Sequence, residues 1–310
     1  MKAFVTGGAG FIGSNLVDAL LARGDTVEVL DDLSTGRWEN LDGALARGAV
    51  LHEHDIRDAE RLLAIVEAAA PDAIFHLAAQ IDVRRAVADP AFDASVNVGG
   101  TINVLEAARR AGVGRVVNSS TGGAIYGEAD SIPTGEATTP APMAPYGQSK
   151  HAAEGYCALY GRLHGVSTVS LRYANVYGPR QDPQGEGGVV AIFCGKLVDG
   201  GQPIAFGDGL QTRDYTYVDD ILSANLAAAG SSWEGACNIG TGTETTVLAL
   251  ADALRALDGS RPFELEHAPE RPGEVRRSAV DPSLAREALG WEARVGLTEG
   301  LRRTLASLQG

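Results

Sequence analysis

The sequence is poor in the residues that cross-link a chain or bind metal ions. Its three cysteines, Cys157, Cys194 and Cys237, lie far apart and without CxxC spacing. This pattern favours buried reduced thiols over disulfides or a zinc site. The six histidines form no HExxH motif, and we expect His52 and His54 to be structural or surface residues. The sequence therefore predicts no metal site.

Long apolar runs and an excess of basic residues are also missing. The sequence has no apolar stretch of 18 residues, and its first apolar segment is too short and too rich in glycine for a signal peptide, which predicts a cytoplasmic protein. The formal net charge is −14. Because this charge repels phosphate polymers and anionic lipid, we expect neither nucleic-acid nor membrane binding.

What remains is an ordinary globular composition, with 45% hydrophobic and 21% charged residues. The first half alternates short β-rich runs with amphipathic stretches, which is typical of a parallel sheet covered by helices on both faces. The first and second strands are expected over 2–6 and 26–30, a third ends before Asp55, and the fourth, fifth and sixth are expected over 73–77, 115–118 and 167–173. Helices are expected over 15–23, 59–69, 92–111 and 146–164. Gly24 and Gly112 would end the first and third of these helices.

The pattern becomes irregular after residue 173, where segments rich in glycine and proline separate short elements. We therefore predict an α/β protein with a Rossmann-type doubly wound parallel sheet over 1–173. A segment near 211–242 is expected to return to this part, and 174–310 would form a smaller C-terminal lobe that closes on a ligand.

The first predicted strand runs into a glycine-rich turn, GGAGFIG. Gly7 and Gly10 would permit a tight turn and close approach to a pyrophosphate, while Gly13 lets the next helix pack on the strand. The N-terminus of that helix would face the negative charge. Asp31 follows 18 residues after Gly13, at the end of the second strand, where its carboxylate would bind ribose hydroxyls and repel a 2′-phosphate. The arrangement predicts NAD binding, in preference to NADP.

Other residues at the turn and at strand ends would line the same cofactor. Phe11 and Ile12 belong to the turn, and the adenosine would lie against the loop after the second strand and the end of the third. Small residues after the fourth strand would let the backbone approach. These further residues are Asp32, Ser34, Thr35, Gly36, Asp55, Ile56, Leu77, Ala78, Ala79 and Gln80.

Tyr146 and Lys150 stand four residues apart on one predicted helix, so they share a face. Lysine is otherwise almost absent, since the sequence has only Lys2 and Lys196 besides. A nearby ammonium and an oxidised nicotinamide both favour phenolate, so we expect the pKa of Tyr146 to be lowered and Tyr146 to act as a general base. Hydroxyls after the fifth strand, Ser119 to Thr121, would lie over the carboxyl edge of the sheet, close to cofactor and substrate.

Nine segments together resemble the extended short-chain dehydrogenase/reductase family, and within it the bacterial UDP-glucose 4-epimerases. In chain order they are TGGAGFIGS, DDLSTG, HLAAQ, SSTGGAIYG, YGQSK, LRYANVYGP, FGDGLQTRDYTYVDD, NIGTG and RPGE, which covers essentially the whole chain. The resemblance implies an enzyme that inverts C4 of a UDP-hexose, interconverting UDP-glucose and UDP-galactose. Hydride would pass from C4 to NAD and return to the other face of a bound 4-keto sugar.

The same resemblance implies residue roles. Tyr146 would remove the 4-hydroxyl proton, Lys150 would bind the nicotinamide ribose, and Thr121 would hydrogen-bond the 4-oxygen, with Ser120 as its alternative. Asn97 and Tyr173 would join the cofactor set. The substrate set would be Thr121, Tyr146, Asn175, Val189, Ala205, Phe206, Arg213, Arg271 and Glu274. Of these, Phe206 and Ala205 would contact uracil, the two arginines would clamp the diphosphate, and Glu274 would reach the uridine ribose.

Several alternatives stay open. A dehydratase needs an acid and a base after Thr121, where this chain has Gly122 and Gly123. A UDP-glucuronate 4-epimerase needs a cation for the carboxylate, but Asp182 occupies the expected place and only Arg84 or Arg85 could substitute.

The small Ser278 would admit an N-acetylated sugar, such as that of UDP-N-acetylglucosamine. A non-catalytic NAD-binding protein would not need the tyrosine–lysine pair.

Two further expectations concern structure. Asp219 and Asp220 are expected to be structural. By analogy with the family, the helices over 92–111 and 147–164 would pair in a homodimer.

Overall fold

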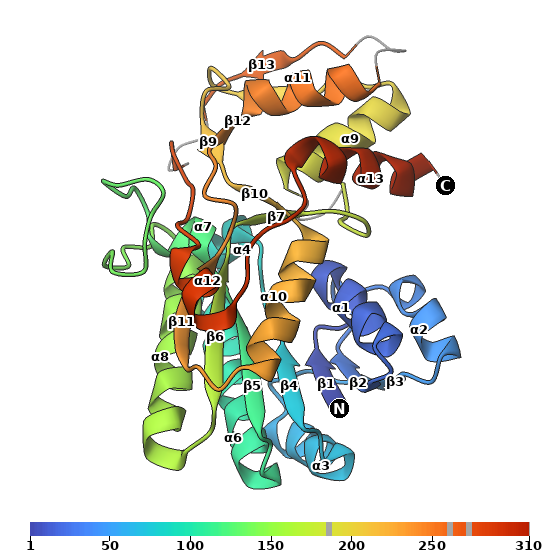
Figure 1. The fold of residues 1–310 in the computed structure, drawn as a ribbon, viewed down its shortest axis with the longest axis vertical. Helices are drawn as coiled ribbons and strands as arrows, with labels where there is room; N and C mark the ends of the chain where they lie inside the picture. The colour runs from blue at the N-terminus through green and yellow to red at the C-terminus, as the bar shows by residue number, and fades with distance from the viewer. Residues whose placement is uncertain (184–187, 259–262, 271–274, 310) are drawn as a thin grey trace.

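A seven-stranded parallel sheet forms the centre of the molecule (Figure 1). The computed structural model describes residues 1–183, 188–258, 263–270 and 275–309. The strand order is β11-β6-β5-β4-β1-β2-β3, so the chain winds outward from β1 in both directions, as predicted. The strands are β1 (Lys2–Thr6), β2 (Thr26–Asp31), β3 (Val50–Glu53), β4 (Ala73–His76), β5 (Arg115–Thr121), β6 (Thr168–Tyr173) and β11 (Gly235–Ile239).

Helices cover both faces of this sheet (Figure 1). One face carries α1 (Phe11–Ala22), α2 (Asp42–Ala46) and α10 (Val218–Gly230), and the other carries α3 (Ala59–Ala69), α6 (Thr101–Ala111) and α8 (Pro145–His164). Because side chains alternate along a strand, neighbouring residues enter different cores. Val5 packs in the core with α1 and α10, whereas Phe4 packs in the core with α3 and α6.

The predicted helix ends are confirmed, and some starts differ. Gly24 and Gly112 have φ of 85° and 68°, the left-handed conformation in which glycine ends a helix at little cost. The first helix begins at Phe11, four residues earlier than predicted, because the glycine turn leads directly into it. The fifth strand runs on to Thr121, which brings its hydroxyl-bearing residues into the sheet.

The prediction of one regular helix over 92–111 is wrong. The segment consists of α5 (Pro90–Ala94), a π-helical turn η2 (Ser95–Gly100) and α6. The Thr101 hydroxyl donates to the carbonyl of Asn97 at 2.7 Å, which provides that carbonyl with a partner inside the widened turn. At Gly100 a Cβ would lie 2.4 Å from Ile56 Cδ1, so the turn also packs closely on the loop after β3.

The rest of the chain forms short strand pairs and helices. The pairs are β7 (Asn175–Tyr177) with β10 (Tyr215–Tyr217), β8 (Ile204–Phe206) with β13 (Glu266–Ala268), and β9 (Thr212–Arg213) with β12 (Thr245–Thr246). Figure 1 shows α9 (Val189–Asp199), α11 (Val247–Leu257) and α13 (Leu297–Gln309) grouped at the end of the molecule opposite α3. The remaining elements are η1 (Trp38–Asn40), α4 (Val83–Ala88), α7 (Gly122–Ile125) and α12 (Ser283–Leu289).

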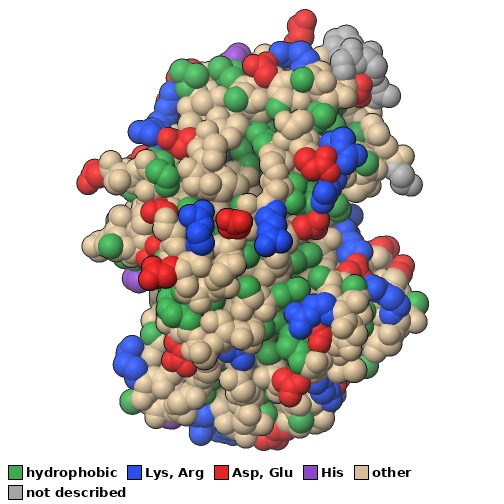
Figure 2. Space-filling view, viewed as in Figure 1, with side chains coloured by type: hydrophobic (Ala, Val, Ile, Leu, Met, Phe, Trp, Pro, Cys, Tyr) green, Lys and Arg blue, Asp and Glu red, His purple; other side chains and the backbone are tan. Residues whose placement is uncertain are grey.

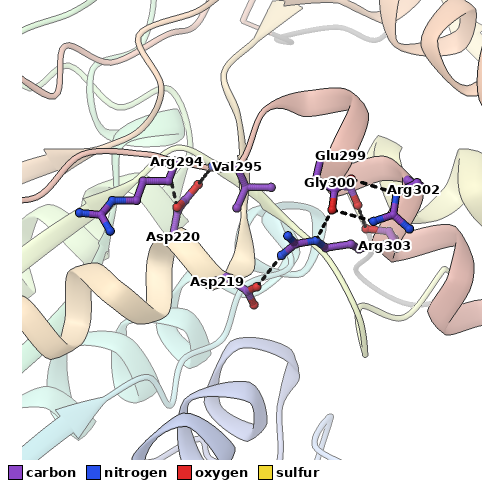
Figure 3. A network of polar contacts seen from close by, with 9 residues as sticks. Asp219, Asp220, Arg294, Val295, Glu299, Gly300, Arg302 and Arg303 are labelled. Atoms are coloured by element: carbon purple, nitrogen blue, oxygen red, sulfur yellow. Dashed lines mark hydrogen bonds and ion pairs between the residues drawn. The ribbon is translucent and has the colours of Figure 1, made fainter.

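Asp219 and Asp220 join α10 to the C-terminal segment, as expected of structural residues (Figure 3). The Asp220 carboxylate accepts the backbone N–H groups of Arg294 and Val295, each at 3.0 Å. Asp219 accepts from the Arg303 guanidinium at 3.1 Å. Both carboxylates therefore hold α10 against residues far along the chain.

Other expectations concern thiols, histidines, membranes and metals. Cys157, Cys194 and Cys237 are free and buried, as predicted. His52 contacts Glu28 and His54 accepts from Arg61. Across the described residues no helix is long and apolar enough to span a bilayer, and no cluster of metal-binding side chains occurs. Figure 2 shows acidic and basic side chains interspersed in a band across the face it displays.

Candidate active site

The turn between β1 and α1 forms a close-fitting cradle. Gly7 has φ of +71°, and a Cβ there would lie 2.5 Å from the backbone nitrogen of Ala78. A Cβ on Gly13 would lie 2.1 Å from the Gly7 carbonyl oxygen. At Gly10 the contact would be 3.3 Å, so the constraint is weaker there. Gly8, which the sequence reasoning missed, also has no room for a side chain, because a Cβ there would lie 2.6 Å from Val29 Cγ1.

Asp31 holds this turn to the end of β2. It is buried, and its two carboxylate oxygens accept the N–H groups of Ala9 and Leu33, each at 2.9 Å. Burial raises the pKa of Asp31, and these hydrogen bonds oppose the rise. Each oxygen keeps a second lone pair, so the carboxylate can still accept from a ribose hydroxyl. The predicted ribose contact remains a prediction.

Several of the predicted adenosine residues lie in the loop that follows Asp31. Ser34 donates its N–H and its hydroxyl to Asp32, at 3.0 and 2.6 Å, which closes a local turn. A Cβ on Gly36 would lie 2.8 Å from Asp31 Oδ1, so the loop passes close to the carboxylate, and Thr35 is exposed beside it. Asp55, at the end of β3, pairs with Arg57.

Residues after β4 come close to the same turn. The backbone N–H of Ala78 donates to the Thr6 hydroxyl at 3.3 Å. Gln80 exchanges two backbone hydrogen bonds with the Asn97 carboxamide, both at 2.9 Å. The structure thus brings Leu77 to Gln80 and Asn97 together, and it uses the Asn97 side chain to fix the backbone of this loop.

His76 is a buried residue of this region that the sequence reasoning missed. Its Nδ1 contacts the Thr6 hydroxyl at 2.7 Å and its Nε2 contacts the Thr101 hydroxyl at 3.0 Å. Burial lowers the pKa of His76 to about 3, so the ring is neutral. The only available signal was a histidine in an otherwise apolar strand. Through these contacts His76 ties the end of β1 to the start of α6.

Tyr146 and Lys150 lie in the first two turns of α8 and face the end of β5. The Tyr146 hydroxyl shares a hydrogen bond with Thr121, and Lys150 Nζ lies 3.4 Å from Ser119 Oγ. Gly147 allows this approach, because a Cβ there would lie 2.4 Å from the Ala124 carbonyl oxygen. The structure therefore brings together the hydroxyl, phenol and ammonium that the sequence predicted as catalytic.

The pKa of Tyr146 differs from the expectation. Burial raises it to about 12, the hydrogen bond with Thr121 opposes the rise, and the charge of Asp93 adds to it. Burial also lowers the pKa of Lys150 to about 8. The desolvation of both groups thus outweighs the mutual effect that the sequence reasoning assumed. The phenol is protonated at neutral pH unless further positive charge is brought to it.

Ser120, the alternative to Thr121, has a different contact. Its hydroxyl donates to Glu154 at 2.5 Å, within the buried interior. Thr121 is the hydroxyl that contacts Tyr146.

The predicted substrate residues lie on short strands and helix ends. Ala205 is buried in β8, and Phe206 lines a small pocket together with Gln211, Glu270, Val275 and Arg276. Asn175 begins β7 and Val189 begins α9. Arg213 donates to the carbonyls of Thr212 and Val275, at 2.7 and 2.9 Å. Arg271 and Glu274 lie outside the described residues, and Tyr173 is buried with its hydroxyl on Asn225.

A glycine cradle at a β1–α1 turn and a tyrosine–lysine pair over the same sheet edge define a dinucleotide-dependent enzyme of the short-chain dehydrogenase/reductase class. The chain belongs to the NAD dependent epimerase/dehydratase family, whose model matches residues 3–240. NAD is accordingly its cofactor, and the cradle fits it: the turn admits no side chain at Gly7 or Gly13, and α1 begins at a glycine cap that leaves its backbone N–H groups for phosphate.

Known relatives are similar over the full chain. A UDP-glucose 4-epimerase of Mycolicibacterium smegmatis is 48% identical, covering 98% of this chain and 97% of that protein. The crystal structure of a Thermotoga maritima UDP-glucose 4-epimerase with UDP-glucose has a TM-score of 0.95 at 46% identity, covering 100% and 99% of the two chains. The Thermus thermophilus UDP-glucose 4-epimerase complex with NAD has a TM-score of 0.92 at 43% identity, covering 100% and 99%.

Proposed function

We propose that this protein interconverts UDP-glucose and UDP-galactose by NAD-dependent epimerisation at C4, through a bound 4-keto sugar. The observation that carries the proposal is the contact of Thr121 with Tyr146, beside a buried Lys150, at the sheet edge that the glycine cradle also reaches. The similarity to UDP-glucose 4-epimerases over the full chain supports the choice of sugar nucleotide.

In the proposed mechanism Thr121 orients the 4-oxygen of the sugar and Tyr146 takes the hydroxyl proton. The cradle at Gly7, Gly10 and Gly13 would hold NAD, which would supply a reversible acceptor for the C4 hydride, so that no net oxidation would occur. Tyr146 then gives its proton back to the 4-oxygen of the inverted sugar. Because burial alone raises the pKa of Tyr146, the positive charges of Lys150 and of the oxidised cofactor are needed to make it a base near neutral pH.

We further infer that two parts of the chain bind different ligands. Residues 1–173, with the returning segment near 211–242, would hold NAD, and 174–310 would hold the nucleotide sugar. The pairing of β11 with β6 supports the return of the later segment. Phe206 and Ala205 would contact uracil, Arg213 and Arg271 the diphosphate, and Glu274 the ribose.

Two rival reactions find less support in the site. At Gly122 a Cβ would lie 2.7 Å from Val280 Cγ1, so the acid that a dehydratase needs there has little room. For a glucuronate epimerase, Asp182 pairs with Arg37, and the mostly exposed Arg84 lies beside Asp82. Arg85, the other candidate cation, stacks on Phe92 with its guanidinium 4.0 Å from the ring centroid.

An N-acetylated sugar is the second candidate substrate, since the half-buried Ser278 is small. The test is to incubate the purified protein separately with UDP-galactose, UDP-N-acetylgalactosamine and UDP-glucuronate and to identify the products. Conversion of UDP-galactose to UDP-glucose is expected. Its absence, with another substrate turned over, would overturn the choice of sugar.

We also infer a homodimer that pairs α8 and the segment 92–111 with their copies, as in the family. Light scattering at micromolar concentration tests it, and a monomer would refute it.

A further inference from the structure

The last three residues of β5 each contact a different side chain of α8. The contacted side chains are spaced by four residues, so they lie on one face of the helix. The three contacts are Ser119 Oγ with Lys150 Nζ at 3.4 Å, Ser120 Oγ with Glu154 Oε1 at 2.5 Å, and Thr121 with the Tyr146 hydroxyl. The proposed mechanism uses Lys150 from the first contact and both residues of the third. The second contact joins Ser120 to Glu154, and neither residue has a chemical task in that mechanism.

Glu154 is one partner of a buried ion pair. Arg172, on β6, donates to both of its carboxylate oxygens, Nε at 2.8 Å and one terminal nitrogen at 2.7 Å. Only 8% of the Arg172 side chain and 7% of the Glu154 side chain are exposed. A bidentate pair in this setting has a defined geometry, because each charge would otherwise lie desolvated and unpaired. It fixes α8 against β6 at the turn that follows Lys150.

The contacts continue to the substrate side. The second terminal nitrogen of Arg172 donates to the Tyr126 hydroxyl at 2.8 Å, and that hydroxyl donates to Asn238 Oδ1 at 2.8 Å. Asn238 in turn donates to the carbonyls of Thr134 and Asp281, at 2.9 and 3.2 Å. All the side chains in this chain of contacts are buried. It therefore connects the end of β5 with the backbone of the segment that leads to Arg276 and Ser278.

We propose that Ser120, Glu154, Arg172, Tyr126 and Asn238 form a positioning network that sets the Thr121 hydroxyl against the Tyr146 hydroxyl. The inference rests on the proposed function only for its kinetic consequence. Ser120 precedes Thr121 directly, so the bond to Glu154 fixes the backbone from which the Thr121 hydroxyl projects. Tyr126 follows α7 and fixes the other side of the same segment. In such a site a displacement of about 1 Å can cost about 100-fold in rate.

The test removes hydroxyls and leaves both charges in place, because removing either charge of the ion pair would leave the other buried and unpaired. Ser120→Ala deletes the bond to Glu154, and Tyr126→Phe deletes the bonds to Arg172 and Asn238. Two matched controls delete hydroxyls of the same kind elsewhere. Thr168→Val removes a buried bond to the Cys157 carbonyl, and Tyr160→Phe removes a bond to Glu106.

Two readouts are combined. The first is the kinetics of UDP-galactose conversion, in which Ser120→Ala and Tyr126→Phe should each lower kcat about tenfold, leave KM within about twofold, and slow the appearance of reduced NAD absorbance. The second uses NAD-loaded protein carrying ¹³C at tyrosine Cζ, with the Tyr146 signal assigned through Tyr146→Phe. That signal should move in both variants, because the hydrogen bond with Thr121 changes. Both control variants should lower Tm without changing kcat, KM or the Tyr146 signal.

An unchanged kcat and an unmoved Tyr146 signal in both variants would reduce the network to a purely structural one and overturn the proposal. A second outcome would also overturn the proposal: Ser120→Ala is as inactive as Thr121→Ala, and the Tyr146 signal does not move. Ser120 would then contact the sugar itself. If the wild-type protein converts no UDP-sugar, the proposed function fails. The Tyr146 signal still decides the positioning network in that case, because it needs no substrate.

Discussion

The region around β5 and α8 differs from the C-terminal region in how its candidate functional groups are held. Thr121 and Lys150 are 8% and 5% exposed, and their neighbours on the strand and helix bond to each other inside the protein. In the C-terminal region, residues 174–310, the ion pair beside the candidate pocket lies at the surface. The pair of Arg276 with Asp208, beside the pocket at Phe206, has side chains that are 44% and 52% exposed.

This contrast separates two tasks. Buried hydrogen bonds act in a low dielectric and fix geometry, which suits groups that must move a proton over a short distance. Exposed ion pairs contribute little free energy and rearrange easily, which suits a surface that closes on a substrate. We therefore expect substitutions around β5 and α8 to change kcat, and substitutions in the C-terminal region to change KM. The predictions below test this division.

The largest effect is expected for Tyr146→Phe, which deletes the proposed proton acceptor. The loss of a general base lowers kcat by about 100-fold to 10,000-fold, while the ring still fills its buried place. Turnover of UDP-galactose and the NAD content of the purified protein should be measured together. We expect retained NAD with turnover lost, and undiminished turnover would refute the assignment of the base.

Lys150→Met should lower activity and raise stability. Burial lowers the pKa of Lys150 from 10.5 to about 8, so the folded protein binds this proton more weakly than the unfolded chain does. At pH 7 the wild type bears almost the full destabilisation, with an upper bound between about 3 and 4 kcal/mol, because the pKa falls from 10.5 to about 8 and each pKa unit is about 1.4 kcal/mol. The cost fades as pH rises from about 8 toward 10.5, where the unfolded chain also loses the proton.

Urea unfolding at pH 7 and pH 9.5 checks this prediction. The variant should exceed the wild type in free energy of unfolding at pH 7, and the difference should shrink at pH 9.5. A variant less stable than the wild type at pH 7 would show that the ammonium is better compensated inside the protein than its burial indicates.

Phe206→Ala tests the other side of the comparison. Phe206 lines the pocket in the C-terminal region, far along the chain from Tyr146, and is proposed to contact uracil. Loss of one aromatic contact should raise KM for UDP-galactose about tenfold with kcat nearly unchanged. Steady-state kinetics gives both constants. A fall in kcat larger than the rise in KM would break the division between the two regions.

The same contrast explains what the sequence could predict. Around the sheet the strands and helices follow local hydrophobic patterns and glycine stops, so the strand at Lys2–Thr6 and the helix at Ala59–Ala69 were predicted with their observed bounds. The π-helical turn Ser95–Gly100 was not, because it depends on the side-chain bond of Thr101 and on packing against Ile56, neither of which has a periodic signal.

Site residues were predictable where a motif fixes them in space. Gly7 and Gly13 pack within one turn, and Tyr146 and Lys150 face the end of β5, as the spacing implied. The raised pKa of Tyr146 could not be predicted, because burial depends on the whole fold around it. Glu154 lies four residues after Lys150, but its partner Arg172 comes from another strand, so only the structure shows the pair.

The smallest effect is expected for Asp252→Asn on α11. Asp252 pairs with Arg255 at 2.7 Å, but the two side chains are 69% and 48% exposed, so solvent screens the pair. The helix is held by Val247, Leu250 and Leu254, which are buried in the core. Tm should therefore change by no more than about 1 °C, with kcat and KM unchanged. A drop of several degrees that high salt reproduces in the wild type would mean that surface charge, and not this apolar face, holds the C-terminal region together.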